Sequence, residues 1–252
     1  MKLFLDELRF IDTEKPLNLS IELSDDEGNP RAWYVEPPTF EPVRTEHYTG
    51  SVEEGGPVNF RDIFFNPHGH STHTECLGHI TSEIFSVNDR IREYFCKAQV
   101  LTVKPTVILN QSDGLHDKVI TADQLCNVSD AVDALIIRTI PNDVNKKNLN
   151  YSNTNPTYLD VNGASILIAK GIKHLLVDLP SVDRESDGGA LVFHHAFWEV
   201  PKNPNHERTI TELIYVSDDI DDGEYILELQ LAAFKNDAAP SRPVLYLSLI
   251  HI

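Results

Sequence analysis

Short runs of alternating apolar and polar residues dominate the chain, and this period of two predicts strands rather than helices. The clearest runs are residues 17–23 and 58–64. Shorter β-rich runs continue to the end of the chain. They lie at residues 98–103, 134–138, 174–179, 210–216, 225–234 and 244–250.

Helical spacing is less common. Residues 159–170 place apolar side chains on one face, and Gly171 stands where a helix C-terminus favours glycine. This helix leads directly into the strand at 174–179, which is an α/β unit, so we expect one mixed α/β domain over residues 1–252. Two shorter helix candidates and two irregular segments complete the pattern. The helices are 87–95 and 121–126, and the irregular segments are 36–42 and 143–155.

Composition and charge narrow the partners. The chain has 252 residues, 39 acidic against 21 basic, for a net charge of −18. Such a chain repels nucleic acid and anionic membrane surfaces. No run reaches the roughly 18 apolar residues of a membrane helix, and Asp6 and Glu7 interrupt the region where a signal peptide is apolar. We therefore expect a cytoplasmic protein, without a disulfide framework for its three cysteines.

The densest chemistry lies between residues 68 and 79, where four of the 11 histidines fall together with one glutamate. Neutral imidazole and carboxylate are ligands that Zn²⁺ and Mn²⁺ accept. Two of these residues stand at i and i+2, which puts them on one face of an extended segment. The sequence therefore predicts a metal site just after the strand at 58–64. Its candidates are His68, His70, His73, Glu75 and His79.

Weaker candidates lie elsewhere. His194 and His195 form a pair inside an apolar stretch, where a core or capping role is the alternative, and Glu212 lies in the predicted strand 210–216. Cys76 could be a nucleophile, although the neighbouring ligand types explain its motif better. The acidic run 218–224 lacks the ligand spacing of a calcium loop, so we interpret it as a turn between strands.

Together these segments resemble the cyclase-type metal-dependent hydrolase family, which includes bacterial kynurenine formamidase (arylformamidase) and isatin hydrolase. The family motif H-x-G-T-H-x-D-x-P-x-H is similar to the run from His68 to His79. The resemblance continues over roughly residues 17–250. Its further matches are Ile137-Arg138-Thr139, the segment with Asp178, Ser181 and Asp183, the order His194 then Glu212, and Ser241-Arg242 near the end.

The chain departs from the family pattern at two points in the first motif. Glu75 stands where the family has aspartate, and its carboxylate reaches further. Gly69 stands where the first histidine is expected, so that ligand is either His68, which we prefer, or His70. A longer interval before Glu212 leaves a similar choice between His194, which we prefer, and His195.

The resemblance implies a compact α/β domain with a mixed, barrel-like central sheet flanked by helices. It also implies a homodimer or higher homo-oligomer, built in part from exchanged N-terminal segments. Trp33 and Tyr34 lie in that N-terminal region and are candidates to line a pocket for a small aromatic substrate.

The resemblance further implies one or two divalent ions, Zn²⁺ ahead of Mn²⁺, that activate water against an amide carbonyl, with His79 shuttling the proton to the leaving nitrogen. N-formylkynurenine, from tryptophan catabolism, is the first substrate to expect. The alternatives are a cyclic amide or lactone, as in isatin hydrolase, and a non-catalytic relative that binds a metal or small molecule. The implied ligands are His68, His73, Glu75, His194 and Glu212.

Overall fold

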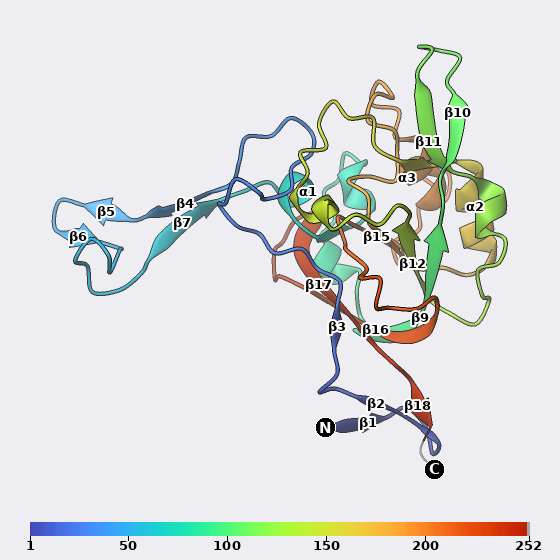
Figure 1. Ribbon diagram of the computed structural model, residues 1–252, viewed down its shortest axis with the longest axis horizontal. Helices are drawn as coiled ribbons and strands as arrows, with labels where there is room; N and C mark the ends of the chain where they lie inside the picture. Colours follow the sequence, from blue (N-terminus) through green and yellow to red (C-terminus); the bar gives the residue numbers. More distant parts are fainter. Residues whose placement is uncertain (251–252) are drawn as a thin grey trace.

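Seven strands close into a mixed barrel in the computed structural model, which describes residues 1–250 (Figure 1). The order around the barrel is β16-β9-β12-β14-β15-β8-β17, and β16 pairs with β17 to close it. Neighbours from β9 to β15 are parallel and the remaining pairs are antiparallel. The strands are β8 (His73–Glu75), β9 (Phe95–Val103), β12 (Ala134–Thr139), β14 (His174–Val177), β15 (Thr209–Glu212), β16 (Gly223–Leu231) and β17 (Ala238–Tyr246).

Strand β12 shows why the barrel strands carry unbroken apolar runs. All six of its residues are buried. Leu135 and Ile137 join a core shared with α2 (Asn162–Ala169) and α3 (Val192–Phe197). Ala134 and Ile136 join a second core with side chains of β9, β16 and β17. Both faces of the strand are covered, which is the situation that favours aliphatic residues at every position. The expected α/β domain with a barrel-like sheet is confirmed.

Helices are few and short. The predicted helix at 159–170 is confirmed as α2, and Gly171 adopts the left-handed φ of +77° that ends it. The predicted helix at 87–95 is wrong. It forms only the 3₁₀ turn η2 (Val87–Asp89), because Phe95 begins β9 and pairs with β16. The candidate at 121–126 is the 3₁₀ turn η3 (Ala122–Leu125). Within residues 1–250 no helix is long and apolar enough to cross a bilayer.

A two-stranded arm projects from the barrel (Figure 1). In it β4 (Thr39–Pro42) pairs with β7 (Arg61–Phe64), and β5 (Arg44–Thr45) pairs with β6 (Tyr48–Thr49) at the tip. The predicted strand at 58–64 therefore exists but stands outside the barrel, with all four β7 residues exposed. The irregular conformation predicted for 36–42 is wrong at 39–42, because those residues pair with β7.

Two small sheets and several short elements complete the chain. One sheet joins β1 (Lys2–Phe4), β2 (Arg9–Asp12) and β18 (Leu249–Ile250), so strands from the start and from the end of the described residues lie side by side (Figure 1). The other joins β10 (Thr106–Leu109), β11 (His116–Ile120) and β13 (Tyr158–Leu159). The short elements are β3 (Leu17–Asn18), which pairs with β17, α1 (Pro67–His70), η1 (Leu77–His79) and η4 (Val144–Asn148).

Several predicted boundaries shift. The strand expected at 17–23 shrinks to β3 and one bridge at Ser20. The strand expected at 210–216 ends at Glu212, because Leu213 takes a left-handed φ of +54°. The acidic run 218–224 starts as the predicted turn between β15 and β16. The segment 143–155, predicted as a loop, includes η4.

Candidate metal centre

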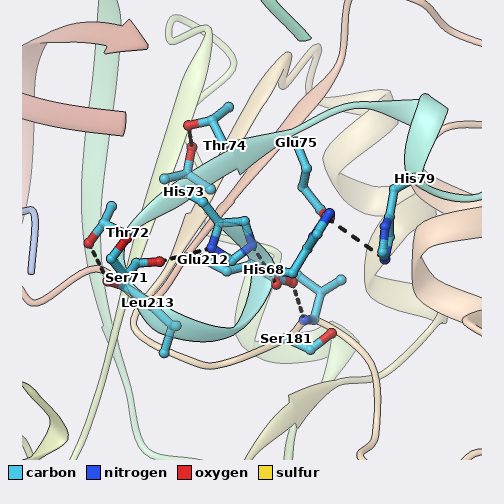
Figure 2. Close-up of polar contacts among 12 residues, drawn as sticks. His68, Ser71, Thr72, His73, Thr74, Glu75, His79, Ser181, Glu212 and Leu213 are labelled. Carbon is cyan, nitrogen blue, oxygen red and sulfur yellow. Dashed lines mark hydrogen bonds and ion pairs between the residues drawn. The ribbon is translucent and has the colours of Figure 1, made fainter. Parts of the chain in front are cut away.

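Strand β8 supplies the centre of the candidate site. His73 and Glu75 alternate with Thr74, so they share the face that looks toward α3. The antiparallel register with β15 places Glu212 directly opposite His73, which brings the two side chains together. Thr74 turns to the other face and hydrogen-bonds Thr211 at 2.8 Å. Figure 2 shows His73, Glu75 and Glu212 converging with His68.

His73 is fully buried and is fixed by one of its two nitrogens. Nδ1 donates to the Ser71 carbonyl at 3.0 Å, so in the neutral ring Nε2 is the nitrogen with the lone pair. Nε2 has no hydrogen-bond partner among the described residues, and it lies 3.5 Å from Glu212 Oε2. Glu212 is oriented through its other oxygen, Oε1, which accepts from the Val182 amide at 3.0 Å. His73, Glu75 and Glu212 each offer a ligand atom within 4.8 Å of the others.

Glu75 belongs to two such groups. Its Oε1 accepts from His194 Nε2 at 2.9 Å. Its Oε2 lies 3.0 Å from His68 Nδ1 and 3.9 Å from His79 Nε2, yet makes no hydrogen bond with any described residue. His68, Glu75 and His79 therefore form a second set of potential ligands, and the fully buried Glu75 carboxylate joins it to the first.

Asp183 positions His194 on α3. Its carboxylate accepts from the backbone amides of Phe193 at 2.7 Å and His194 at 3.1 Å, which satisfies free donors at the start of the helix. The same carboxylate accepts from His194 Nδ1 at 2.6 Å. This bond fixes the ring orientation and aims Nε2 at Glu75, as carboxylates behind metal-binding histidines do.

The structure separates the alternative histidines. His68 lies on α1, where Asn66 caps its amide at 2.9 Å, and it joins the cluster. A Cβ at Gly69 would meet Val35 at 2.8 Å, so no ring fits at that position. His70 uses both nitrogens elsewhere, accepting from the Asn66 amide and donating to the Glu36 carbonyl.

His194 and His195 are separated in the same way. His194 joins the cluster, whereas His195 donates from Nδ1 to the Val200 carbonyl at 3.3 Å and belongs to neither group of potential ligands. Each preferred histidine thus lies at the site and each alternative lies away from it.

His79 closes the cluster from η1. Its ring stacks on His68 with centroids 4.2 Å apart. Figure 2 shows the ring facing Glu75, and its Nδ1 lies 3.4 Å from Asp237 Oδ2. The sequence analysis missed Asp237, which also accepts from His68 Nε2 at 2.9 Å. Asp237 directly precedes β17, which pairs with β8, and only that pairing brings Asp237 to residues 68–79.

The electrostatics favour a cation in this cluster. Burial raises the pKa of Glu75, but His79 and His194 lower it more strongly, so Glu75 is ionised. Burial lowers the pKa of His68 and of His194, whereas the carboxylates around each ring raise it to about 10. Protons on the histidines thus compensate the charge of the buried carboxylates. A bound divalent ion would displace those protons and compensate the same charge.

Two buried atoms show that the residues fit such an ion. His73 Nε2 presents a lone pair and Glu75 Oε2 a charged oxygen, and neither has a hydrogen-bond partner among residues 1–250. Leaving buried polar atoms unpaired costs about 1–3 kcal/mol each, which an ion would recover. The donors are imidazole nitrogens and carboxylate oxygens, the set that Zn²⁺ and Mn²⁺ both accept.

A cavity of about 340 Å³ opens beside the cluster. Trp33, Val35 and Leu191 supply apolar wall, and His68, His79, His194 and Glu212 reach its surface. Tyr34 is 61% exposed and donates to Glu185, a lining residue, at 3.0 Å. Of the two predicted pocket residues, the structure therefore places Trp33 in the wall and Tyr34 on the outer side of it.

Cys76 does not share the site's environment. The side chain is buried, its Sγ donates to the Phe85 carbonyl at 3.4 Å, and burial raises the pKa of the thiol to about 11. A thiol that stays protonated is a poor nucleophile, so this geometry favours a packing role.

Comparison with known proteins identifies the family and the fold. The family model described as "Putative cyclase" matches residues 17–184. The fold resembles a protein described as a predicted metal-dependent hydrolase from Bacillus stearothermophilus (TM-score 0.59, 17% identity, covering 92% of this chain and 98% of that one). It also resembles isatin hydrolase A from Labrenzia aggregata, bound to benzyl benzoate (TM-score 0.62, 11% identity, 92% and 93% covered). No curated protein matches the chain in sequence.

Proposed function

The chain belongs to the "Putative cyclase" family, and we propose that it is a metal-dependent hydrolase that cleaves an amide C–N bond. The observation that carries the proposal is the pair of buried ligand groups joined through Glu75, with unpaired His73 Nε2 and Glu75 Oε2, beside a cavity that has Trp33 in its wall. A structural polar cluster would satisfy those atoms internally, whereas a catalytic centre leaves them for an ion.

His73, Glu75 and Glu212 would hold one divalent ion and His68 with Glu75 a second, while His194 completes the set through Nε2. Zn²⁺ is our first candidate and Mn²⁺ the second. When bound, such an ion polarises a carbonyl and brings the pKa of water down to about 7.

His79 is the proposed proton shuttle. Its Nε2 faces Glu75 and its ring lines the cavity, so one nitrogen can reach both a water and a substrate. An amide nitrogen leaves poorly unless it is protonated, and a positioned imidazole can take a proton from water and deliver it to that nitrogen. Trp33, Val35 and Leu191 would hold an apolar substrate body and exclude bulk water.

The proposed substrate is an aryl formamide, with N-formylkynurenine tested first. A cavity of about 340 Å³ with one indole in its wall suits a small aromatic compound. A cyclic amide such as isatin is the second candidate, because two structural neighbours are isatin hydrolases, from Labrenzia aggregata and Ralstonia solanacearum. A non-catalytic binding protein is the remaining alternative, and the position of His79 between Glu75 and the cavity argues against it.

The test begins with metal content per chain, on protein purified without chelator. About two Zn²⁺ or Mn²⁺ ions support the pair of groups joined by Glu75, and about one favours a single-ion site. Hydrolysis of N-formylkynurenine and of isatin is then measured on the same preparation. His79→Ala is expected to keep the metal and lose most turnover. No metal after incubation with excess Zn²⁺ and Mn²⁺ would refute the proposal.

We also propose that the projecting arm contacts a second copy of the chain. An isolated two-stranded ribbon is marginally stable, and this arm exposes Phe60, Ile63 and Phe64 by 56%, 52% and 75%. Burial of those side chains by a partner would stabilise it. Light scattering should give a dimer or larger assembly, and Phe64→Glu should shift it toward monomer, whereas an unchanged monomeric mass in both proteins would contradict the proposal.

A further inference from the structure

We infer that Asp237 is a positioning residue that sets two histidines at once, His68 for metal binding and His79 for proton transfer. Asp237 lies immediately before β17, and its side chain is only 17% exposed. A single oxygen, Oδ2, lies 2.9 Å from His68 Nε2 and 3.4 Å from His79 Nδ1. One carboxylate therefore contacts the two stacked rings.

These contacts select the tautomer of each ring. A carboxylate only accepts, so Asp237 favours a proton on His68 Nε2 and on His79 Nδ1, and it holds that proton there when the opposite nitrogen gives its own up. The opposite nitrogens, His68 Nδ1 and His79 Nε2, then face Glu75 at 3.0 Å and 3.9 Å. Without Asp237 either ring could place its proton on the working nitrogen, which would block ligation by His68 and proton uptake by His79.

The arrangement also explains how two imidazoles can stack at a centroid distance of 4.2 Å. Positive charge on either ring is compensated by the shared carboxylate. Burial raises the pKa of Asp237, but hydrogen bonds and charge from His68 and His79 lower it more strongly. The carboxylate therefore stays ionised and remains an acceptor. The backbone of Asp237 is held too, because its carbonyl accepts from the Cys76 amide at 3.1 Å.

Asp237 acts from behind the rings rather than as a ligand. His68 meets Asp237 through Nε2 and Glu75 through Nδ1, so the two carboxylates lie at different edges of the same ring. The candidate ions belong on the Glu75 side, next to His73 and Glu212. Carboxylates that hold a ligating histidine from behind change metal affinity or activity by about 10–100-fold when removed.

The first measurement is metal affinity, by competition with a chromogenic chelator, for the wild type, Asp237→Ala and Asp237→Asn. We expect affinity to fall about 10–100-fold in Asp237→Ala with the number of ions unchanged. Asp237→Asn keeps an acceptor oxygen, so its metal affinity should lie between those of the wild type and Asp237→Ala. Asn236→Ala, in the same turn, is the matched control and should match the wild type. Thermal melts establish that each variant folds.

Two double variants separate the roles. In a His68→Ala background, Asp237→Ala should cause no further loss of affinity. At saturating metal, Asp237→Ala should lower kcat with little change in KM, and in a His79→Ala background it should lower kcat no further. Additive losses in both backgrounds, or an ion missing from Asp237→Ala at saturating metal, would overturn the inference. The kcat measurement rests on the proposed hydrolase function, whereas the affinity cycle with His68 does not, so the two failures are distinguishable.

Discussion

Two buried carboxylate clusters lie on this barrel, and they differ in whether their hydrogen bonds are complete. Around Asp178, at the end of β14, the Thr139 amide donates at 2.8 Å, the Thr139 hydroxyl at 3.0 Å and Lys146 Nζ at 2.7 Å. Lys146 also donates to the Thr139 carbonyl at 2.6 Å. Around Glu75 the partners are histidines, and one carboxylate oxygen has no hydrogen bond among the described residues.

The difference indicates what each cluster does. Burial raises the pKa of Asp178, against the lowering effect of Lys146 and Thr139, and a cation inside the protein compensates its charge. The Glu75 cluster has carboxylates and imidazoles but no lysine or arginine among the groups that form it. The Asp178 cluster carries a lysine as its fixed cation, whereas the imidazoles around Glu75 can give up their protons when an ion binds.

The largest expected effect comes from Glu75→Gln, which removes the carboxylate common to both ligand groups. Metal binding should be lost from both groups, and turnover should fall about 10³-fold or more, since the ion's contribution is several kcal/mol. The metal-free protein should melt lower than the wild type, because the carboxylate whose pKa the histidines hold down is lost from beside His194 and His68. Metal analysis, kinetics and melts in chelator check this. Retained stoichiometric metal would contradict the joint role of Glu75.

Lys146→Met should lose stability but keep the metal. It leaves Asp178 buried without its cation, so we expect a loss of about 3 kcal/mol in the free energy of unfolding, measured in urea. Metal stoichiometry should not change, because Lys146 contacts Asp178, Thr139 and Asn142 rather than the histidines. Lys146→Met with Asp178→Asn should recover part of the stability. If Lys146→Met were as stable as the wild type, Lys146 would not be the cation that stabilises Asp178, and the contrast with the Glu75 cluster would fail.

Local patterns explain why part of the site could be predicted from sequence. His73 and Glu75 share a face because they are two residues apart on a strand, and Gly171 ends α2 because of its own conformational freedom. The resemblance of the motif to a known family added the preference for His68 and His194, both of which lie in the cluster.

The missed features depend on pairings between distant segments. Asp237 reaches His68 only because β17 pairs with β8. Lys146 lies in a segment that sequence analysis assigned to a surface loop, yet its amine is inside because Asp178 and Thr139 lie beneath it. No spacing along the chain encodes these contacts, since they follow from strand register and barrel closure.

Adding metal to the metal-free protein should distinguish the Glu75 cluster from the Asp178 cluster, with an effect of intermediate size. A ligand that binds only the folded protein stabilises it by about 2.7 kcal/mol at a hundredfold excess over its Kd. Adding Zn²⁺ or Mn²⁺ to metal-free protein should therefore raise the melting temperature of the wild type and of Lys146→Met by similar free energies, and that of Glu75→Gln hardly at all. A similar gain in Glu75→Gln would place the ion outside the Glu75 cluster.

The smallest effect is expected at His70, and it provides a matched pair with His68. His70→Ala removes a buried ring that accepts from the Asn66 amide and donates to the Glu36 carbonyl. Loss of these partners should lower the free energy of unfolding by about 2 kcal/mol while metal affinity and stoichiometry remain those of the wild type. His68→Ala should instead lower metal affinity with little loss in the free energy of unfolding, because Nδ1 of His68 faces Glu75 and the ring mainly serves the ion. Measuring metal binding and urea unfolding on both variants decides between the two histidines. Loss of metal in His70→Ala with retention in His68→Ala would reverse the assignment of the first ligand.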